Sequence, residues 1–216
     1  GLVIFTLMIF AVLNNINNVA REQPDRVTGG YDVVASVRPE FALNIEELQL
    51  GIEKSPNLNL GDFEVIAQSI NIPAIGRELN SDNKKFSNIT IRSVDSTYME
   101  NTLLQFVKVH PDYQGDHSSV WQALSRDSDL VVISNSALPT NDPFGPSTVG
   151  LQLNSIATDS DEGYWPESGI HLEILARQGS GEATNVEVIG IIDSLADQQD
   201  WVRSVYIVAS DSIGKH

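Results

Sequence analysis

Hydrophobic side chains are distributed unevenly along this chain, and the sharpest change comes near its start. Residues 1–13 carry no charge, and Thr6 is their only polar side chain, whereas the sequence from Asn14 onward is polar and acidic. A helix packed on a protein surface should show a polar stripe, and this segment shows none. We therefore expect the outer part of a transmembrane helix over residues 1–21, which enters water near Asn14.

The run is shorter than the ~20 apolar residues that span a bilayer, so the helix is expected to have begun before residue 1. A signal peptide would show a basic start and a small-residue cleavage site, which are not seen here, and a buried core helix is the alternative. The predicted membrane segment consists of Leu2, Val3, Ile4, Phe5, Leu7, Met8, Ile9, Phe10, Val12 and Leu13.

A strand–helix–strand pattern follows a short linker over residues 22–30, which contains Pro24 and ends in Gly29 and Gly30. Valine-rich residues 31–37 predict a strand. Asn44 is a candidate N-cap of a helix that stops before Pro56, with two glutamates in its first turn, where the helix dipole favours negative charge.

The second strand of this unit is predicted over residues 63–72, because apolar and polar residues alternate there and Pro73 follows. If the two strands are parallel, the crossover is right-handed. We assign residues 31–86 to this βαβ lobe.

Residues 87–216 are richer in strand patterns. Strands are expected over 87–94 and 130–134, and residues 170–177 and 186–192 flank a glycine-rich turn typical of a hairpin. Other expected elements are a short helix capped by Asp95 or Ser96, a helix over 120–127 capped by Ser118 or Ser119, and a strand over 202–209.

Residues 139–169, with four prolines, form an irregular excursion. The predicted fold class is α+β.

Composition narrows the function classes. The net charge of -16 and sequence pI of about 4.4 argue against nucleic-acid binding, which needs clustered lysine and arginine. The chain has no cysteine, which excludes disulfides, thiolate metal sites and cysteine nucleophiles.

The order of elements resembles the FtsX-like/MacB-like ABC transporter permease family. The resemblance rests on an apolar helix, the junction DRVTGGYDVVA, the βαβ pattern, the stretch SSVWQALSRDSDLVVIS and a hairpin ending in VEVIGII. It implies a porter-like βαβ lobe and a mostly β lobe on the extracytoplasmic side of the cell membrane. One departure is that no further helix and strand follow the strand at 204–209.

The resemblance also implies partners: a cytoplasmic ATP-binding subunit or domain, a second permease copy in a dimer, and an extracytoplasmic partner protein. The expected role is non-catalytic transmission of ATP-driven motion, with Gly29 and Gly30 as the hinge. A membrane-anchored sensor or ligand-binding ectodomain is the alternative.

No catalytic, cofactor or metal site is predicted. The residues from His110 to His117 contain two histidines and two aspartates but match no ligand motif, so a solvated turn is expected. The acids after Asp159 lack the downstream glutamate of a calcium loop. Ser134 and Ser136 follow an apolar strand without a nucleophile-elbow motif.

Two further residues are candidates for surface roles. Trp165 lies in the irregular excursion, where an exposed aromatic side chain would suit a partner contact. Asn88 opens an Asn-Ile-Thr sequon and is a possible glycosylation site if the domain is extracytoplasmic.

Overall fold

The computed structural model describes residues 30–31, 45–81, 84–139, 147–156, 165–176, 183–193 and 202–211. The predicted membrane segment, Gly29 and most of the predicted strand over 31–37 lie outside these residues, as do the acids after Asp159. Within the part that is described, no helix has both the length and the apolar character needed to cross a bilayer.

The described elements are mainly strands. They are β1 (Ser69–Glu78), β2 (Ser87–Val94), β3 (Phe106–Val109), β4 (Leu130–Ser134), β5 (Ser147–Val149), β6 (Ile170–Ala176), β7 (Thr184–Ile192), β8 (Val202–Ser204) and β9 (Tyr206–Ser210). The helices are α2 (Ile45–Glu53), α3 (Ser96–Asn101) and α4 (His117–Arg126), with short 3-10 turns η2 (Leu60–Asp62), η3 (Pro111–Tyr113) and η4 (Asn135–Ala137).

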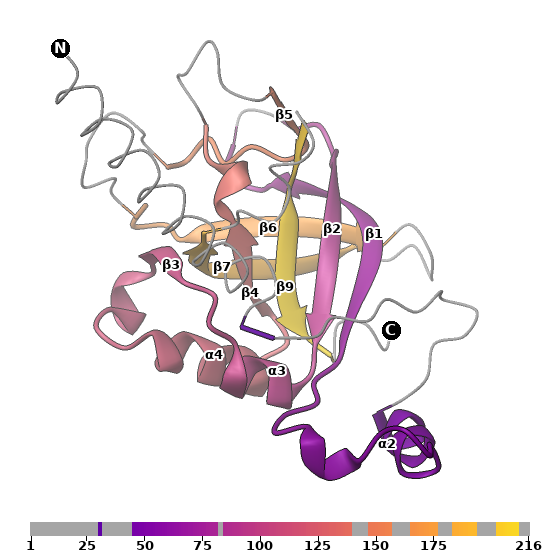
Figure 1. Ribbon diagram of the computed structural model, residues 1–216. Helices are drawn as coiled ribbons and strands as arrows, with labels where there is room; N and C mark the ends of the chain where they lie inside the picture. Colours follow the sequence, from indigo (N-terminus) through magenta and orange to yellow (C-terminus); the bar gives the residue numbers. More distant parts are fainter. Residues whose placement is uncertain are drawn as a thin grey trace, which may run out of the picture.

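Six of the strands close into a barrel (Figure 1). The sheet order is β3-β7-β4-β9-β2-β1-β6, and β6 also pairs with β7, which joins the two ends of the β7-to-β6 run. The pairings in the barrel are mixed, because β2 runs parallel to β9 and β4 parallel to β7, whereas the other barrel pairs are antiparallel. Closure removes the free edges that an open sheet would expose.

Side chains alternate between the interior of the barrel and its outer surface. In β9, Ile207 and Ala209 belong to the interior cluster, as does Val205 just before the strand, whereas Tyr206 and Val208 belong to a second cluster outside. This is the period of two that a strand imposes. The interior is filled by aliphatic residues from all six barrel strands, including Ala74, Ile89, Ile91, Val131, Ile133, Ile170, Leu172, Ile174, Val186, Val188 and Ile191.

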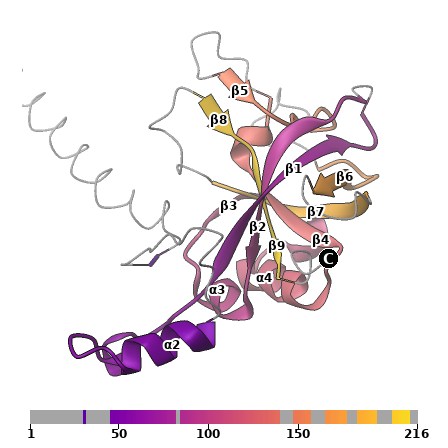
Figure 2. The ribbon, with the colours of Figure 1, turned by 90° about the vertical axis from the view of Figure 1, so that its right-hand side faces the viewer.

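Helices α3 and α4 cover one part of the outer surface (Figures 1 and 2). Tyr98 and Met99 of α3 pack with Val120, Trp121 and Leu124 of α4 over the outward side chains of the barrel. Asp95 caps α3 by accepting the N–H of Tyr98 at 2.7 Å. Ile189, Ile192 and Val208 lie beneath the helices.

Strand β7 contains an irregularity that lets β3 approach. Val131 pairs with Val188 and Val132 with Gly190, so Ile189 is an extra residue on β7. A Cβ atom at Gly190 would lie 2.7 Å from Cε1 of Phe106. Glycine is therefore required for the Phe106 ring to pack against the strand.

A buried carboxylate holds the loop over residues 151–156 against the end of β1. Glu78 is 3% exposed and accepts the N–H of Asn154 at 2.8 Å, the N–H of Ser155 at 3.3 Å and the hydroxyl of Ser155. Leu151, Leu153 and Ile156 from this loop belong to the interior cluster. The hydrogen bonds to Glu78 thus stabilise the loop that supplies them.

Several predicted elements are confirmed. Helix α2, strand β2 and the antiparallel β6–β7 hairpin lie where the sequence predicts them. The helix expected at 120–127 begins earlier, at His117, and its cap is Asp116, whose carboxylate accepts the N–H and hydroxyl of Ser118.

The strand predicted over residues 63–72 is misplaced. It begins at Ser69 and runs through Pro73 to Glu78. Among the described residues, pairing with β6 starts at Ala74, and Pro73 is paired only with Thr90 of β2. Proline is tolerated in a strand where its nitrogen has no ladder hydrogen bond to make. The porter-like lobe and the division at residue 86 stay predictions, and β1 and β2, which flank that division, pair with each other.

Helix α2 and turn η2 project away from the barrel (Figure 2). Leu48 and Leu50 are 40% and 50% exposed, and Ile52 is the buried member of the helix.

The contact between α4 and the barrel should dominate the stability of the outer layer. Leu124 is fully buried, and Leu124→Ala removes three carbon atoms and leaves a cavity, so we expect a loss of about 2–5 kcal/mol in the free energy of unfolding, measured by urea denaturation. Gln122→Ala, on the exposed face of the same helix, is the matched control and should change the value by less than about 0.5 kcal/mol. Equal effects of the two changes would contradict this packing.

Candidate functional site

The junction between the predicted linker and the folded part is anchored by two residues. Gly30 has a φ of 92°, and a Cβ atom there would lie 2.6 Å from Cγ of Leu103. The ring of Tyr31 stacks on Tyr98 of α3, with 5.5 Å between the ring centroids. The chain therefore enters the domain beside α3, at a position that only glycine fits.

The Tyr31 hydroxyl is buried and has no hydrogen-bond partner among the described residues. Burial, with smaller contributions from Tyr98 and Asp95, raises the pKa of Tyr31 to about 12. The neutral phenol is thus strongly preferred in the folded chain.

A cleft of about 960 Å³ lies along β3. One wall is the strand itself together with His110 and the residues that follow it, and the other is the segment from Trp165 to Gly169. Glu187 of β7 contributes a carboxylate.

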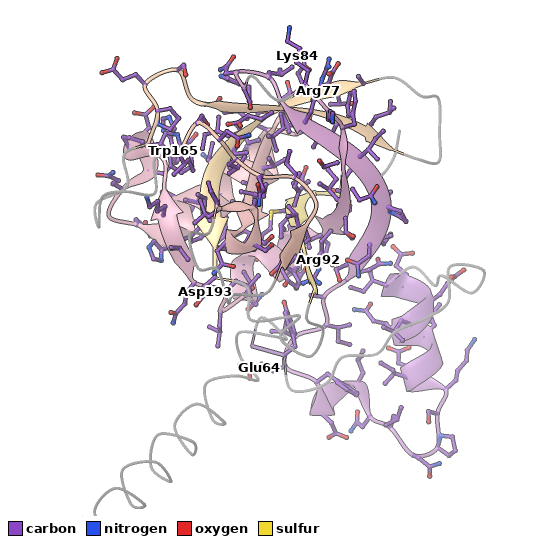
Figure 3. The ribbon with its side chains drawn as sticks, turned by 90° about the horizontal axis from the view of Figure 1, so that it is seen from above. Glu64, Arg77, Lys84, Arg92, Trp165 and Asp193 are labelled. Atoms are coloured by element: carbon purple, nitrogen blue, oxygen red, sulfur yellow. The ribbon has the colours of Figure 1, made fainter. Side chains whose placement is uncertain are left out.

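Trp165 is buried in this wall, so the expectation of an exposed side chain is wrong. Its side chain is 7% exposed and belongs to the interior cluster of the barrel. The ring of His110 meets it nearly at a right angle, with 5.5 Å between the centroids. Figure 3 shows Trp165 at the side of the barrel remote from the appended α2. The partner contact proposed for Trp165 stays a prediction.

The indole Nε1 of Trp165 is buried without a hydrogen-bond partner in the described part of the chain. An orphaned buried donor costs stability.

The histidines around the cleft take part in local packing. Nδ1 of His110 accepts the N–H of Asp112 at 3.2 Å, and its ring also contacts Tyr113. The ring of His117 packs against Phe106, and Nε2 of His171 lies 3.1 Å from the carbonyl oxygen of Ser168. Over the described ranges, no three histidine or carboxylate side chains gather as a metal site would require.

Asp116, between the histidines, has a lowered pKa because Ser118 donates its hydroxyl and its backbone N–H to the carboxylate. Its role is to cap α4.

The two candidate serines serve the barrel. Ser134 is fully buried and Ser136 is 4% exposed, and their Oγ atoms are 2.6 Å apart. The hydroxyl oxygen of Ser134 accepts the N–H of Tyr206 at 3.1 Å and so links β4 to β9. These contacts explain the serines structurally, and solvent does not reach the Ser134 hydroxyl.

Basic residues near the barrel surface are engaged by neighbours. Arg77 forms an ion pair with Glu173 and lies 4.7 Å from the Phe86 ring centroid. Arg92 lies 4.8 Å from the ring centroid of Tyr206. The arginines labelled in Figure 3 are thus apart from each other, on different parts of the sheet.

Asn88 is exposed at the start of β2, opposite Ile75 of β1. Glycosylation there stays a prediction.

The comparisons with known proteins give similar chains only among solved structures. No family model matches the chain, and no curated protein matches it. Among solved structures, the chain is similar to an extracellular domain of an ABC-type transporter. That domain belongs to the noncanonic ABC-type transporter YknZ from Gram-positive bacteria, with 14% sequence identity, a TM-score of 0.39 and 79% of this chain covered.

The match covers 64% of the YknZ domain, which is less than two thirds of its length. A likeness of this extent carries no argument about function, and the proposal below rests on the residues of this chain.

Replacement of Trp165 tests the orphaned donor. Trp165→Phe keeps an aromatic ring but packs less well, and it also removes the buried N–H that has no partner. The two effects oppose each other, so the free energy of unfolding should change by less than about 1 kcal/mol. Trp165→Ala removes the ring altogether and should cost about 3–5 kcal/mol. Urea denaturation measures both. A large loss for the phenylalanine variant would mean that the indole N–H has a partner.

The phenol at the junction should make stability depend on pH in alkaline solution. The unfolded chain releases the Tyr31 proton near pH 10.0, whereas the folded chain keeps it until about 12, so stability falls as pH rises through this window. Tyr31→Phe should lack that part of the decline. The measurement is urea denaturation of both chains at a series of pH values, and parallel curves would contradict the shift.

Proposed function

We propose that this chain is the extracytoplasmic domain of an ABC-type permease and has no catalytic activity of its own. In this role a cytoplasmic ATP-binding subunit drives the membrane helices, and the first helix transmits the motion outward. The domain then moves against a second permease copy or an extracytoplasmic partner protein.

The observation that carries the proposal is the junction between two unlike segments. Residues 1–13 are uncharged, whereas the whole chain has a net charge of -16. An anionic membrane surface repels such a domain, so attachment to the membrane would come from the apolar segment. The order of elements after this junction is the one that resembles the permease family.

The packing at the junction supports the mechanical role. Gly30 fits tightly against Leu103, and Tyr31 stacks on α3. A displacement of the linker would therefore be passed to α3 and the barrel, and Gly29, which precedes these contacts, is the better hinge candidate of the pair.

A rigid hinge should uncouple the domain from ATP. We replace Gly29 by a short helical insert and keep Gly30, because its backbone conformation and close contact require glycine. These 216 residues contain no cysteine, so Gln122→Cys on the exposed face of α4 gives this domain a single site for a spin label, in a transporter whose other cysteines are replaced. The measured quantity is the distance between the labels on two copies in the complete transporter. This distance should shift with ATP in the chain without the insert and stay fixed in the insert variant. ATP hydrolysis should persist in both.

The matched control carries the same insert after Asn57, in the exposed turn that follows α2. It should retain the ATP-dependent distance shift. An unchanged shift in the Gly29 variant would refute the hinge. A complete gene without further membrane crossings would refute the permease assignment itself.

A further inference from the structure

The two edges of β7 are shared by three strands, and among the described residues no strand pairs with the outer edge of β3. Strand β4 pairs with β7 from Glu187 to Ile192, so it occupies one edge. Strands β3 and β6 both overlap this stretch of β7, so both must lie on its other edge, end to end. Beside β6 the next strand is β1, which ends at Glu78. Beside β3 the described residues place no strand.

The outer edge of β3 carries backbone groups directed away from β7. The N–H of His110 donates to the carbonyl oxygen of Ile189 at 2.9 Å, and Val109 pairs with Gly190. In an antiparallel ladder the N–H and C=O groups of the residue between hydrogen-bonded pairs point outward. Val109 is such a residue.

Phe106 is in the same situation at the other end of the strand. The N–H of Asp193 donates to the carbonyl oxygen of Gln105 at 2.8 Å, and Phe106 pairs with Ile192. Phe106 therefore also presents its backbone groups to the outer edge.

The cleft follows this edge. Residues 106–110 all line the cleft. Because successive side chains of a strand point to opposite faces, a cleft lined by consecutive residues must lie along the edge of β3 and not over one face alone. The side chain of Val107, in the middle of β3, is 48% exposed. The wall formed by Trp165 and the residues after it stands opposite.

The charges around the cleft indicate the chemistry of an occupant. Asp112, Glu167 and Glu187 place three carboxylates on the lining, against the one ammonium of Lys108. A second copy of the chain would bring the same carboxylates and its own net charge of -16, which disfavours it. A cationic segment is attracted instead.

We propose that the outer edge of β3 binds an extended, cationic segment of a partner protein, which adds a strand to the sheet within the cleft. Main-chain hydrogen bonds to Phe106 and Val109 give the affinity, and the carboxylates select basic side chains. This goes beyond the proposed function by stating where and how an extracytoplasmic partner would dock. It depends on the backbone geometry of β3 and on the carboxylates of the cleft, not on attachment to a membrane, so failure of either proposal leaves the other standing.

The test uses the full 216-residue chain in detergent micelles and a defined probe. The probe is an acetylated and amidated octapeptide of alternating valine and lysine, titrated against the protein by isothermal calorimetry. Its counterpart, N-methylated at every residue, keeps the side chains and the charge but has no backbone N–H. We expect saturable binding of the probe. The methylated peptide should bind with an affinity at least about tenfold lower.

Two variants of the same residue locate the site. Val109→Pro removes the outward N–H and blocks the edge while leaving the N–H of His110 in place, and it should lower the affinity about tenfold or more. Val109→Ala loses the same side-chain packing but keeps the N–H, so it should bind the probe within about twofold of the unmodified chain.

Amide hydrogen exchange gives an independent readout. In the free chain the amides of Phe106 and Val109 should exchange rapidly, and the probe should slow them. Slow exchange without probe would show that the chain covers this edge itself, and concentration-dependent slowing would show that a second copy does. Either result would overturn the proposal. Equal binding of the two peptides would overturn it as well, because it would indicate charge attraction alone. The absence of saturable binding of the probe would also overturn it.

Discussion

Strand β7 makes hydrogen bonds to three other strands, and the arrangement of the molecule follows from how its two edges are shared. One edge is taken by β4 along most of its length. The other is divided, with β6 beside its first half and β3 beside its second. The pairing with β6 closes the barrel, and the extra residue Ile189 lies where β6 gives way to β3. Closure buries the aliphatic interior, and the helices α3 and α4 then cover the outward side chains that remain.

Local sequence patterns predicted the elements whose determinants are local. The alternation in β2 and in the β6–β7 hairpin, the acidic first turn of α2 and the aspartate before α3 were sufficient to place them. The strand prediction over residues 63–72 is misplaced because proline usually ends a strand, whereas Pro73 lies inside β1 and pairs with Thr90 of β2. Ring closure could not be predicted, since it depends on partners such as Thr90 and Tyr206 that are far apart in the chain.

The candidate site shows the same division. The sequence indicates a turn around His110 and a candidate contact residue at Trp165. Nothing in the local pattern indicates that the rings of His110 and Trp165 pack against each other. An aromatic residue in an irregular stretch is a reasonable surface candidate, and the burial of Trp165 follows from the position of its segment over the barrel. No strand is predicted over β3, because its four residues are too few positions to establish a period.

The position of β9 has a consequence for biosynthesis. This strand comes last among the described strands yet lies between β2 and β4, and its register with β2 joins residues more than a hundred positions apart, as in Thr90 with Tyr206. A ribosome must therefore synthesise the chain from β2 through β9 before the barrel can close, and such non-local pairing is slow. Until then the nascent chain leaves the edges of β2 and β4 that β9 will pair with unpaired, and such edges are prone to aggregation.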